Sequence, residues 1–155
     1  CALPVITYAR ELGVSDEKLY RALTLTNLIA LHQKRYIGNL SAYCGAVSAG
    51  AAAACGVAYL HGEGYDVIGR TIVNSLGNVG GIVCDGAKAS CAAKIASAVN
   101  SGLLAYEMAR RGRGFPFGEG LVEGDYEQTI RNFGRLGKDG MKSTDVEILN
   151  MMIGK

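Results

Sequence analysis

The sequence predicts an all-α protein, a helical domain wrapped around a central, buried helix that is rich in alanine and glycine. No Asp, Glu, Lys or Arg occurs between Tyr36 and Gly62, and ten of the fourteen residues 45–58 are Ala or Gly. A helix that is apolar on every side is a buried helix, and its small residues let neighbouring backbones approach closely. No segment shows the alternation of apolar and polar residues that is typical of a strand.

Helical periodicity and capping residues delimit the elements around this Ala/Gly helix. Pro4 suits the first turn of a helix that runs to Leu12, because the N–H that proline lacks is not needed there. Ser15 is expected to cap a second helix over residues 15–37, whose apolar positions recur at steps of three and four residues. The remaining helices, with the Ala/Gly helix first, are expected at residues 44–60, 65–76, 89–111, 125–136 and 143–152. Gly137 and Gly140 predict a turn between the last two.

Length and charge limit the classes of protein to be considered. A chain of 155 residues is long enough for one domain with a proper core, so residues 1–155 are expected to form a single helical domain. The net charge of +2 does not indicate binding to nucleic acid or to an anionic membrane. The uncharged run is long enough to span a bilayer, but its serines, its glycines and Asn39 disfavour insertion.

The five cysteines point to a reducing compartment. An odd number of cysteines, with no visible signal peptide, favours the cytoplasm over a disulfide framework. Cys44 stands at the start of the Ala/Gly helix, Cys84 lies in a Gly-rich loop and Cys91 opens the next long helix, and helix N-termini stabilise thiolates. Three such thiolates suit an iron–sulfur cluster or a three-ligand zinc site, but their spacing alone favours buried core thiols. Cys55, among alanines, is expected to be a core residue.

Three segments carry a resemblance to a known family: residues 40–50, 81–94 and 144–152. Together they closely resemble the C-terminal part of bacterial L-cysteine desulfidases, a group related to the α chain of iron–sulfur L-serine dehydratases. The resemblance covers essentially the whole chain. Its most specific part is the run Cys-Asp-Gly-Ala-Lys-x-Ser-Cys-Ala-x-Lys, which extends from Cys84 to Lys94.

This resemblance implies an all-helical domain with a [4Fe–4S] cluster held by Cys44, Cys84 and Cys91, and no pyridoxal phosphate. The implied reaction is a β-elimination in which the substrate is a small amino acid: L-cysteine and water give sulfide, ammonia and pyruvate. L-Serine dehydratase activity, with hydroxide as the leaving group, is the alternative. The resembling proteins are much longer, and their upstream half carries a Ser/Gly/Asn-rich motif expected to help form the substrate pocket. The chain is therefore expected to be the cluster-binding C-terminal piece of such an enzyme, inactive without the missing N-terminal half.

The elimination needs a base that removes the α-proton of the substrate. Within the chain the candidates are His32 and Lys88, and the missing half is an equally good source of the base. His32 would otherwise be an ordinary helix-surface or core histidine, and Lys88 would otherwise neutralise the thiolates. Two rival hypotheses are a non-catalytic helical domain with buried thiols and a zinc hydrolase-like site. Small-residue helices also often pack across subunits, so a homo-oligomer is a further expectation.

Overall fold

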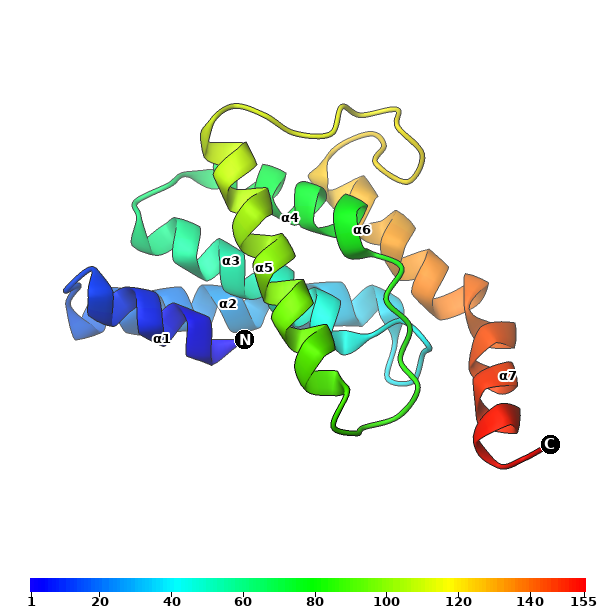
Figure 1. Ribbon diagram of the computed structural model, residues 1–155. Helices are drawn as coiled ribbons and strands as arrows, with labels where there is room; N and C mark the ends of the chain where they lie inside the picture. The colour runs from blue at the N-terminus through cyan, green and yellow to red at the C-terminus, as the bar shows by residue number, and fades with distance from the viewer.

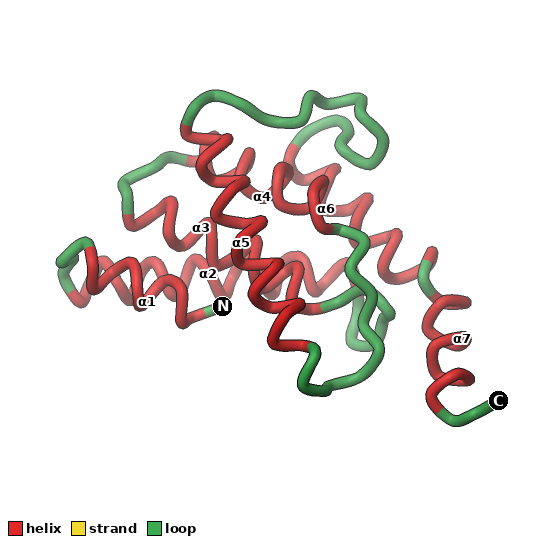
Figure 2. Tube along the Cα trace, viewed as in Figure 1, coloured by secondary structure: helices red, strands yellow, loops and turns green.

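The computed structural model describes residues 1–155 and consists of seven α-helices and one π-helical turn, without a strand (Figures 1 and 2). The elements are α1 (Ala2–Glu11), α2 (Asp16–Ile37), α3 (Gly45–Leu60), α4 (Tyr65–Val79), α5 (Cys91–Arg110), α6 (Tyr126–Arg135), the π-helical turn η1 (Leu136–Gly140) and α7 (Lys142–Met152). The predicted all-α class is confirmed.

Helix α3 is the Ala/Gly-rich helix, and it lies at the centre of the molecule in contact with α1, α2, α4 and α5. Twelve of its 16 residues are buried. A glycine on each helix allows α3 and α5 to approach closely: a Cβ on Gly50 would lie 2.5 Å from the carbonyl oxygen of Ala98 in α5, and one on Gly102 of α5 would lie 2.7 Å from the carbonyl oxygen of Gly50. The predicted central helix is therefore confirmed. Neither α3 nor any other helix has both the length and the hydropathy that a membrane crossing requires.

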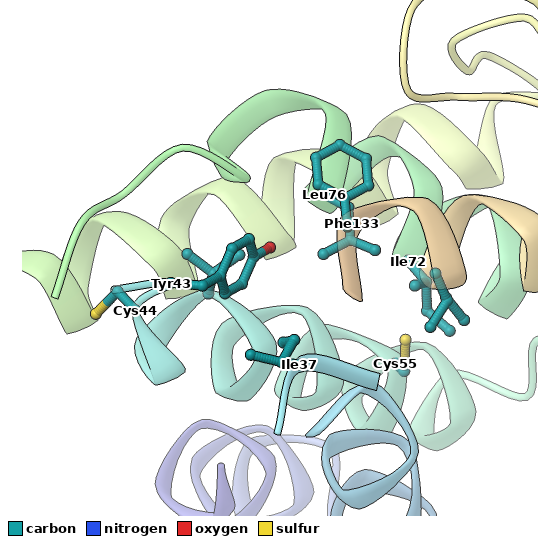
Figure 3. Packing of buried hydrophobic residues seen from close by; sticks show 9 residues of the cluster. Ile37, Tyr43, Cys44, Cys55, Ile72, Leu76 and Phe133 are labelled. Atoms are coloured by element: carbon teal, nitrogen blue, oxygen red, sulfur yellow. The ribbon is translucent and has the colours of Figure 1, made fainter. Parts of the chain in front are cut away.

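The largest hydrophobic cluster joins the end of α2 to α3, α4 and α6 (Figure 3). Tyr43 and Phe133 bring aromatic rings into it, and Cys55 lies inside it without any exposed surface. Burial raises the pKa of the Cys55 thiol, which is the behaviour expected of a core residue. Cys44 lies at one end of the cluster, and its sulfur points away from the other labelled side chains in Figure 3.

Helix boundaries differ from the sequence expectation at two glycine-containing segments. Helix α4 continues through Gly77 to Val79, because Gly77 makes room for a neighbour: a Cβ there would lie 2.8 Å from the ring of Phe115. Between α6 and α7 the expected turn is instead η1, which keeps the backbone helical. The amide of Met141 donates to the carbonyl oxygen of Leu136 over 2.9 Å, so that α7 begins without a side-chain cap.

Candidate iron–sulfur site

A short backbone pairing brings the segments of Cys44 and Cys84 together at the N-terminal end of α3. The amide of Cys44 donates to the carbonyl oxygen of Ile82 over 3.0 Å. The amide of Cys84 donates to the carbonyl oxygen of Ala42 over 2.6 Å. These two bonds form one isolated antiparallel bridge, in which alternate residues point to the same face. Cys44 and Cys84 are therefore diagonal neighbours on one face of the pairing.

Cys91 reaches the same loop from the other side, as the first residue of α5. Its sulfur lies 3.5 Å from the carbonyl oxygen of Gly86, to which the thiol donates. Gly86 has a φ of +88°, a left-handed conformation that glycine adopts without a steric penalty. This turn reverses the chain between Cys84 and Cys91, so both cysteines belong to one compact loop.

An acidic residue and two lysines surround this loop. The carboxylate of Asp85 accepts hydrogen bonds from the ammonium groups of both Lys88 and Lys94. The bond from Lys88, followed by that from Lys94, lowers the pKa of Asp85 to about 2. The bond with Asp85 also raises the pKa of Lys94, and negative charge on Cys44 and Cys91 raises it further. Lys94 is thus a cation close to two of the three predicted ligands.

His32 lies in a different part of the molecule. Its Nε2 is 2.7 Å from one carboxylate oxygen of Glu127, and the hydroxyl of Tyr36 donates to the other oxygen over 2.7 Å. Burial alone would raise the pKa of Glu127, but these hydrogen bonds outweigh it and lower that pKa. His32 lines an open, largely apolar cleft of about 980 Å³ between α2, α4 and α6, and no cysteine lines this cleft. Of the two candidate bases, only Lys88 is near the cysteine loop.

The donor set at the loop fits an iron–sulfur cluster in its chemistry. None of Cys44, Cys84 and Cys91 is in a disulfide; the first is buried and the others are half-buried. The first two amides of α3, those of Gly45 and Ala46, donate to no acceptor in the protein. Such free N–H groups favour a negative charge beside Cys44. The sulfurs themselves are not arranged as a ready-made metal site, since no three His, Cys, Asp or Glu side chains in the structure have that arrangement.

The comparison with protein families covers almost the whole chain, because the model of the serine dehydratase alpha chain matches residues 1–150. The chain belongs to the serine dehydratase alpha chain family. This membership confirms the resemblance found in the cysteine-containing segments at the level of the family. No solved structure matches the chain.

Several curated proteins that are similar to this chain are named UPF0597 proteins. That of Desulfitobacterium hafniense, DSY1109, is 56% identical over 154 residues, which are 99% of this chain and 36% of the relative. That of Treponema denticola is 52% identical over 152 residues, or 98% of this chain and 35% of the relative. That of Finegoldia magna is 49% identical over 155 residues, or 100% of this chain and 37% of the relative. The chain therefore spans little more than a third of the length of the relatives it matches.

Sequence reasoning did not identify the roles of three residues that shape these sites, Asp85, Lys94 and Glu127. Asp85 and Lys94 lie within the cysteine-containing run, which points to the segment, but their contact crosses a loop and a helix start and follows from no local pattern. Glu127 is 95 residues from His32, and no local pattern connects the two. Only the packing of α6 against α2 brings that pair together.

Proposed function

We propose that this chain is the cluster-binding part of an iron–sulfur-dependent lyase that eliminates the β-substituent of a small amino acid. The observation that carries the proposal is the meeting of Cys44, Cys84 and Cys91 at one loop, by backbone pairing and the Gly86 turn. Membership of the serine dehydratase alpha chain family supports it independently. The free state of all five cysteines accords with a reducing compartment such as the cytoplasm.

The proposed substrate is L-cysteine, which with water gives sulfide, ammonia and pyruvate. The specific run from Cys84 to Lys94 favours this assignment through its resemblance to L-cysteine desulfidases. L-Serine is the second candidate, favoured by the name of the family model; it gives ammonia and pyruvate. Both reactions break a Cα–H bond and a bond at Cβ, so the same base serves either substrate.

Cys44, Cys84 and Cys91 would hold a [4Fe–4S] cluster, and no pyridoxal phosphate is required. When bound, a cluster with three protein ligands supplies one iron that is free to act as a Lewis acid. Among the protein groups, Lys88 and Lys94 balance the negative charge of Asp85, and Lys94 also lies close to the negative charge of Cys44 and Cys91. The free amides at the start of α3 add partial positive charge beside Cys44.

The base that removes the α-proton is proposed to come from the region of the full-length protein that this chain does not span. The ammonium of Lys88 is in an ion pair with Asp85, an arrangement in which it donates a hydrogen bond instead of accepting a proton. His32 is hydrogen-bonded to Glu127 in the cleft that no cysteine lines. The chain would accordingly be inactive without the rest of the enzyme.

The test uses the full-length protein, purified without oxygen and reconstituted with iron and sulfide. Iron, zinc and acid-labile sulfide are measured, and pyruvate release is assayed from L-cysteine and from L-serine in parallel. The variant Cys84→Ser is compared with Cys55→Ser, which changes a fully buried core thiol.

We expect iron and pyruvate release in the wild type, both lost in Cys84→Ser and both retained in Cys55→Ser. Zinc without iron would support the hydrolase-like site instead. An absence of both metals would support a non-catalytic helical domain with buried thiols. Pyruvate from L-serine alone would reassign the substrate.

A further inference from the structure

Lys94 connects the cysteine loop to the first turn of α5 through two separate contacts. Its ammonium donates to the carbonyl oxygen of Val83 over 2.8 Å and to the carboxylate of Asp85. Val83 and Asp85 are the residues immediately before and after Cys84. One side chain therefore contacts the residues on both sides of Cys84, the backbone of Val83 and the side chain of Asp85.

The contact matters because Lys94 comes from α5, the helix that begins with Cys91. Lys94 lies three residues after Cys91, so both belong to the first turn of α5. The contacts of Lys94 thus fix the segment of Cys84 relative to the helical turn that carries Cys91. The side chain is only 24% exposed, so solvent screens its contacts less than those of a surface ion pair.

The neighbouring Lys88 provides a natural comparison, because it has the same charge and the same partner. Its ammonium also donates to Asp85, but it makes no contact with the carbonyl group of Val83 and its side chain is 50% exposed. Both lysines therefore place a positive charge beside Asp85. Lys94 alone also links the backbone of Val83 to the first turn of α5.

We infer that Lys94 is a positioning residue that fixes the segment of Cys84 relative to the helical turn that carries Cys91, two of the three proposed cluster ligands. The inference rests on the proposed function and extends it, because it assigns the ligand geometry to a residue that is not itself a ligand. Hydrogen-bonding partners outside the ligand set typically change metal affinity by roughly 10- to 100-fold when they are removed. We therefore expect Lys94→Met to lose iron to a chelator about tenfold faster than the wild type.

The experiment compares Lys94→Met, Lys94→Arg and the control Lys88→Met in the full-length protein. The first measurement is iron and acid-labile sulfide per chain after anaerobic reconstitution, with the electron paramagnetic resonance spectrum of the reduced protein and the rate of iron loss to a chelator. The second is hydrogen exchange at residues 82–86 in protein without a cluster. Circular dichroism checks that each variant retains its helices.

The positioning role predicts less iron, an altered spectrum and faster exchange at residues 82–86 for Lys94→Met. Lys94→Arg should restore part of each signal, because arginine keeps the charge and can donate to both partners. Lys88→Met should resemble the wild type. Equal behaviour of the Lys88 and Lys94 variants would overturn the inference in favour of simple charge neutralisation, as would unchanged exchange in Lys94→Met. If the wild type binds no iron, the proposed function fails, while the exchange measurement still decides whether Lys94 holds the loop.

Discussion

The two helices on either side of the cysteine loop, α3 and α7, differ in how much of each helix is buried. Helix α3 buries 12 of its 16 residues, whereas α7 buries none. Within the chain, α7 packs against η1, and Figure 1 shows it at one end of the molecule. Its contact with the loop is limited: Met152 lies against Gly86, and Met151 and Met152 line a small cleft of about 390 Å³ together with Asp85, Lys88 and Lys94.

This difference follows only in part from hydrophobicity, although α3 has no charged side chain and α7 has Lys142, Asp145 and Glu147. Helix α7 contains large apolar side chains that remain more than half exposed, among them Val146, Leu149 and Met151. Helix α3 is buried because its alanines and glycines let four helices approach it, and close approach requires small residues more than large apolar ones. The cysteine loop consequently has one rigid side, formed by α3 and α5, and one loosely held side, formed by α7.

The largest effect is expected where α3 crosses α5. In Gly50→Ala, the new Cβ would lie 2.5 Å from the carbonyl oxygen of Ala98 and 2.9 Å from its Cβ. No rotamer change relieves a backbone clash, so the two helices must separate, at an expected loss of about 3 kcal/mol in the free energy of unfolding. Urea denaturation followed by circular dichroism measures this loss.

Gly45→Ala is the matched control for that substitution, since a Cβ at Gly45 meets no atom within 4 Å. Alanine also has the higher helix propensity, so the control should be neutral or slightly stabilising. Because α3 and α5 carry Cys44 and Cys91, Gly50→Ala should also retain less iron than Gly45→Ala. Equal stability of the two variants would show that the crossing of α3 and α5 is looser than the structure has it.

The next largest effect is expected at Asn74, which fixes the loop after α5 to α4. Its amide donates to the carbonyl oxygens of Ala105 and Arg113 over 3.3 and 3.2 Å, and its oxygen accepts from the amide of Phe115 over 3.1 Å. Asn74→Ala leaves these groups without their partner and should cost about 2 kcal/mol.

The exposed Asn78 of the same helix is the control, with an expected change within about 0.5 kcal/mol for Asn78→Ala. Thermal unfolding of the two variants side by side gives the comparison. Similar melting temperatures would mean that the loop after α5 contributes little to the rigid side of the molecule.

A smaller effect is expected at Glu127, which links α6, and through it η1 and α7, to α2. Glu127→Gln weakens the contacts with His32, Tyr36 and Arg131. Because the carboxylate is 38% exposed, solvent screening limits the loss to less than about 1 kcal/mol near neutral pH. Iron binding should not change, since these residues lie apart from the cysteine loop.

The free energy of unfolding that Glu127→Gln loses should become smaller as the pH falls. The pKa of Glu127 is lower in the folded protein than its ordinary value, so its contribution is complete above the unfolded pKa of about 4.3. The contribution disappears as the pH falls through the folded pKa, because protonation then occurs in both states. Unfolding curves of wild type and Glu127→Gln from pH 7 down to pH 3 should therefore converge, with Glu147→Gln in α7 as a control that removes no ion pair. A difference that grew on acidification would contradict this account.

The burial of α3 was predicted correctly from the sequence, because a helix without charged residues is apolar on every side and is therefore buried. The prediction failed at η1 because Gly137 was interpreted as a turn residue. In the structure Gly137 is buried, and a Cβ would lie 3.1 Å from the side chain of Tyr43, so glycine is present for close packing and not for a reversal of the chain. An isolated sequence does not distinguish these two uses of glycine.

The candidate site likewise has features that the sequence indicates and features that only the tertiary structure reveals. The three cysteines are candidates from the sequence because each lies at a helix start or in the loop before one, and their role as ligands stays a prediction. The contacts of Lys94 follow from the way α5 begins beside that loop, and the partner of His32 follows from the packing of α6 against α2. Both depend on tertiary structure, which local periodicity does not contain.

The smallest effect is expected on α7 itself, where Leu149 is 56% exposed. Leu149→Gln keeps a residue of similar helix propensity and removes an apolar side chain that packs on nothing buried, so the free energy of unfolding should change by no more than about 0.5 kcal/mol. Urea denaturation measures that change, and hydrogen exchange should show that the amides of α7 open far more readily than those of α3. A loss above about 1 kcal/mol would mean that α7 packs against more than η1, and the loop that carries Cys84 would then be held firmly from both sides.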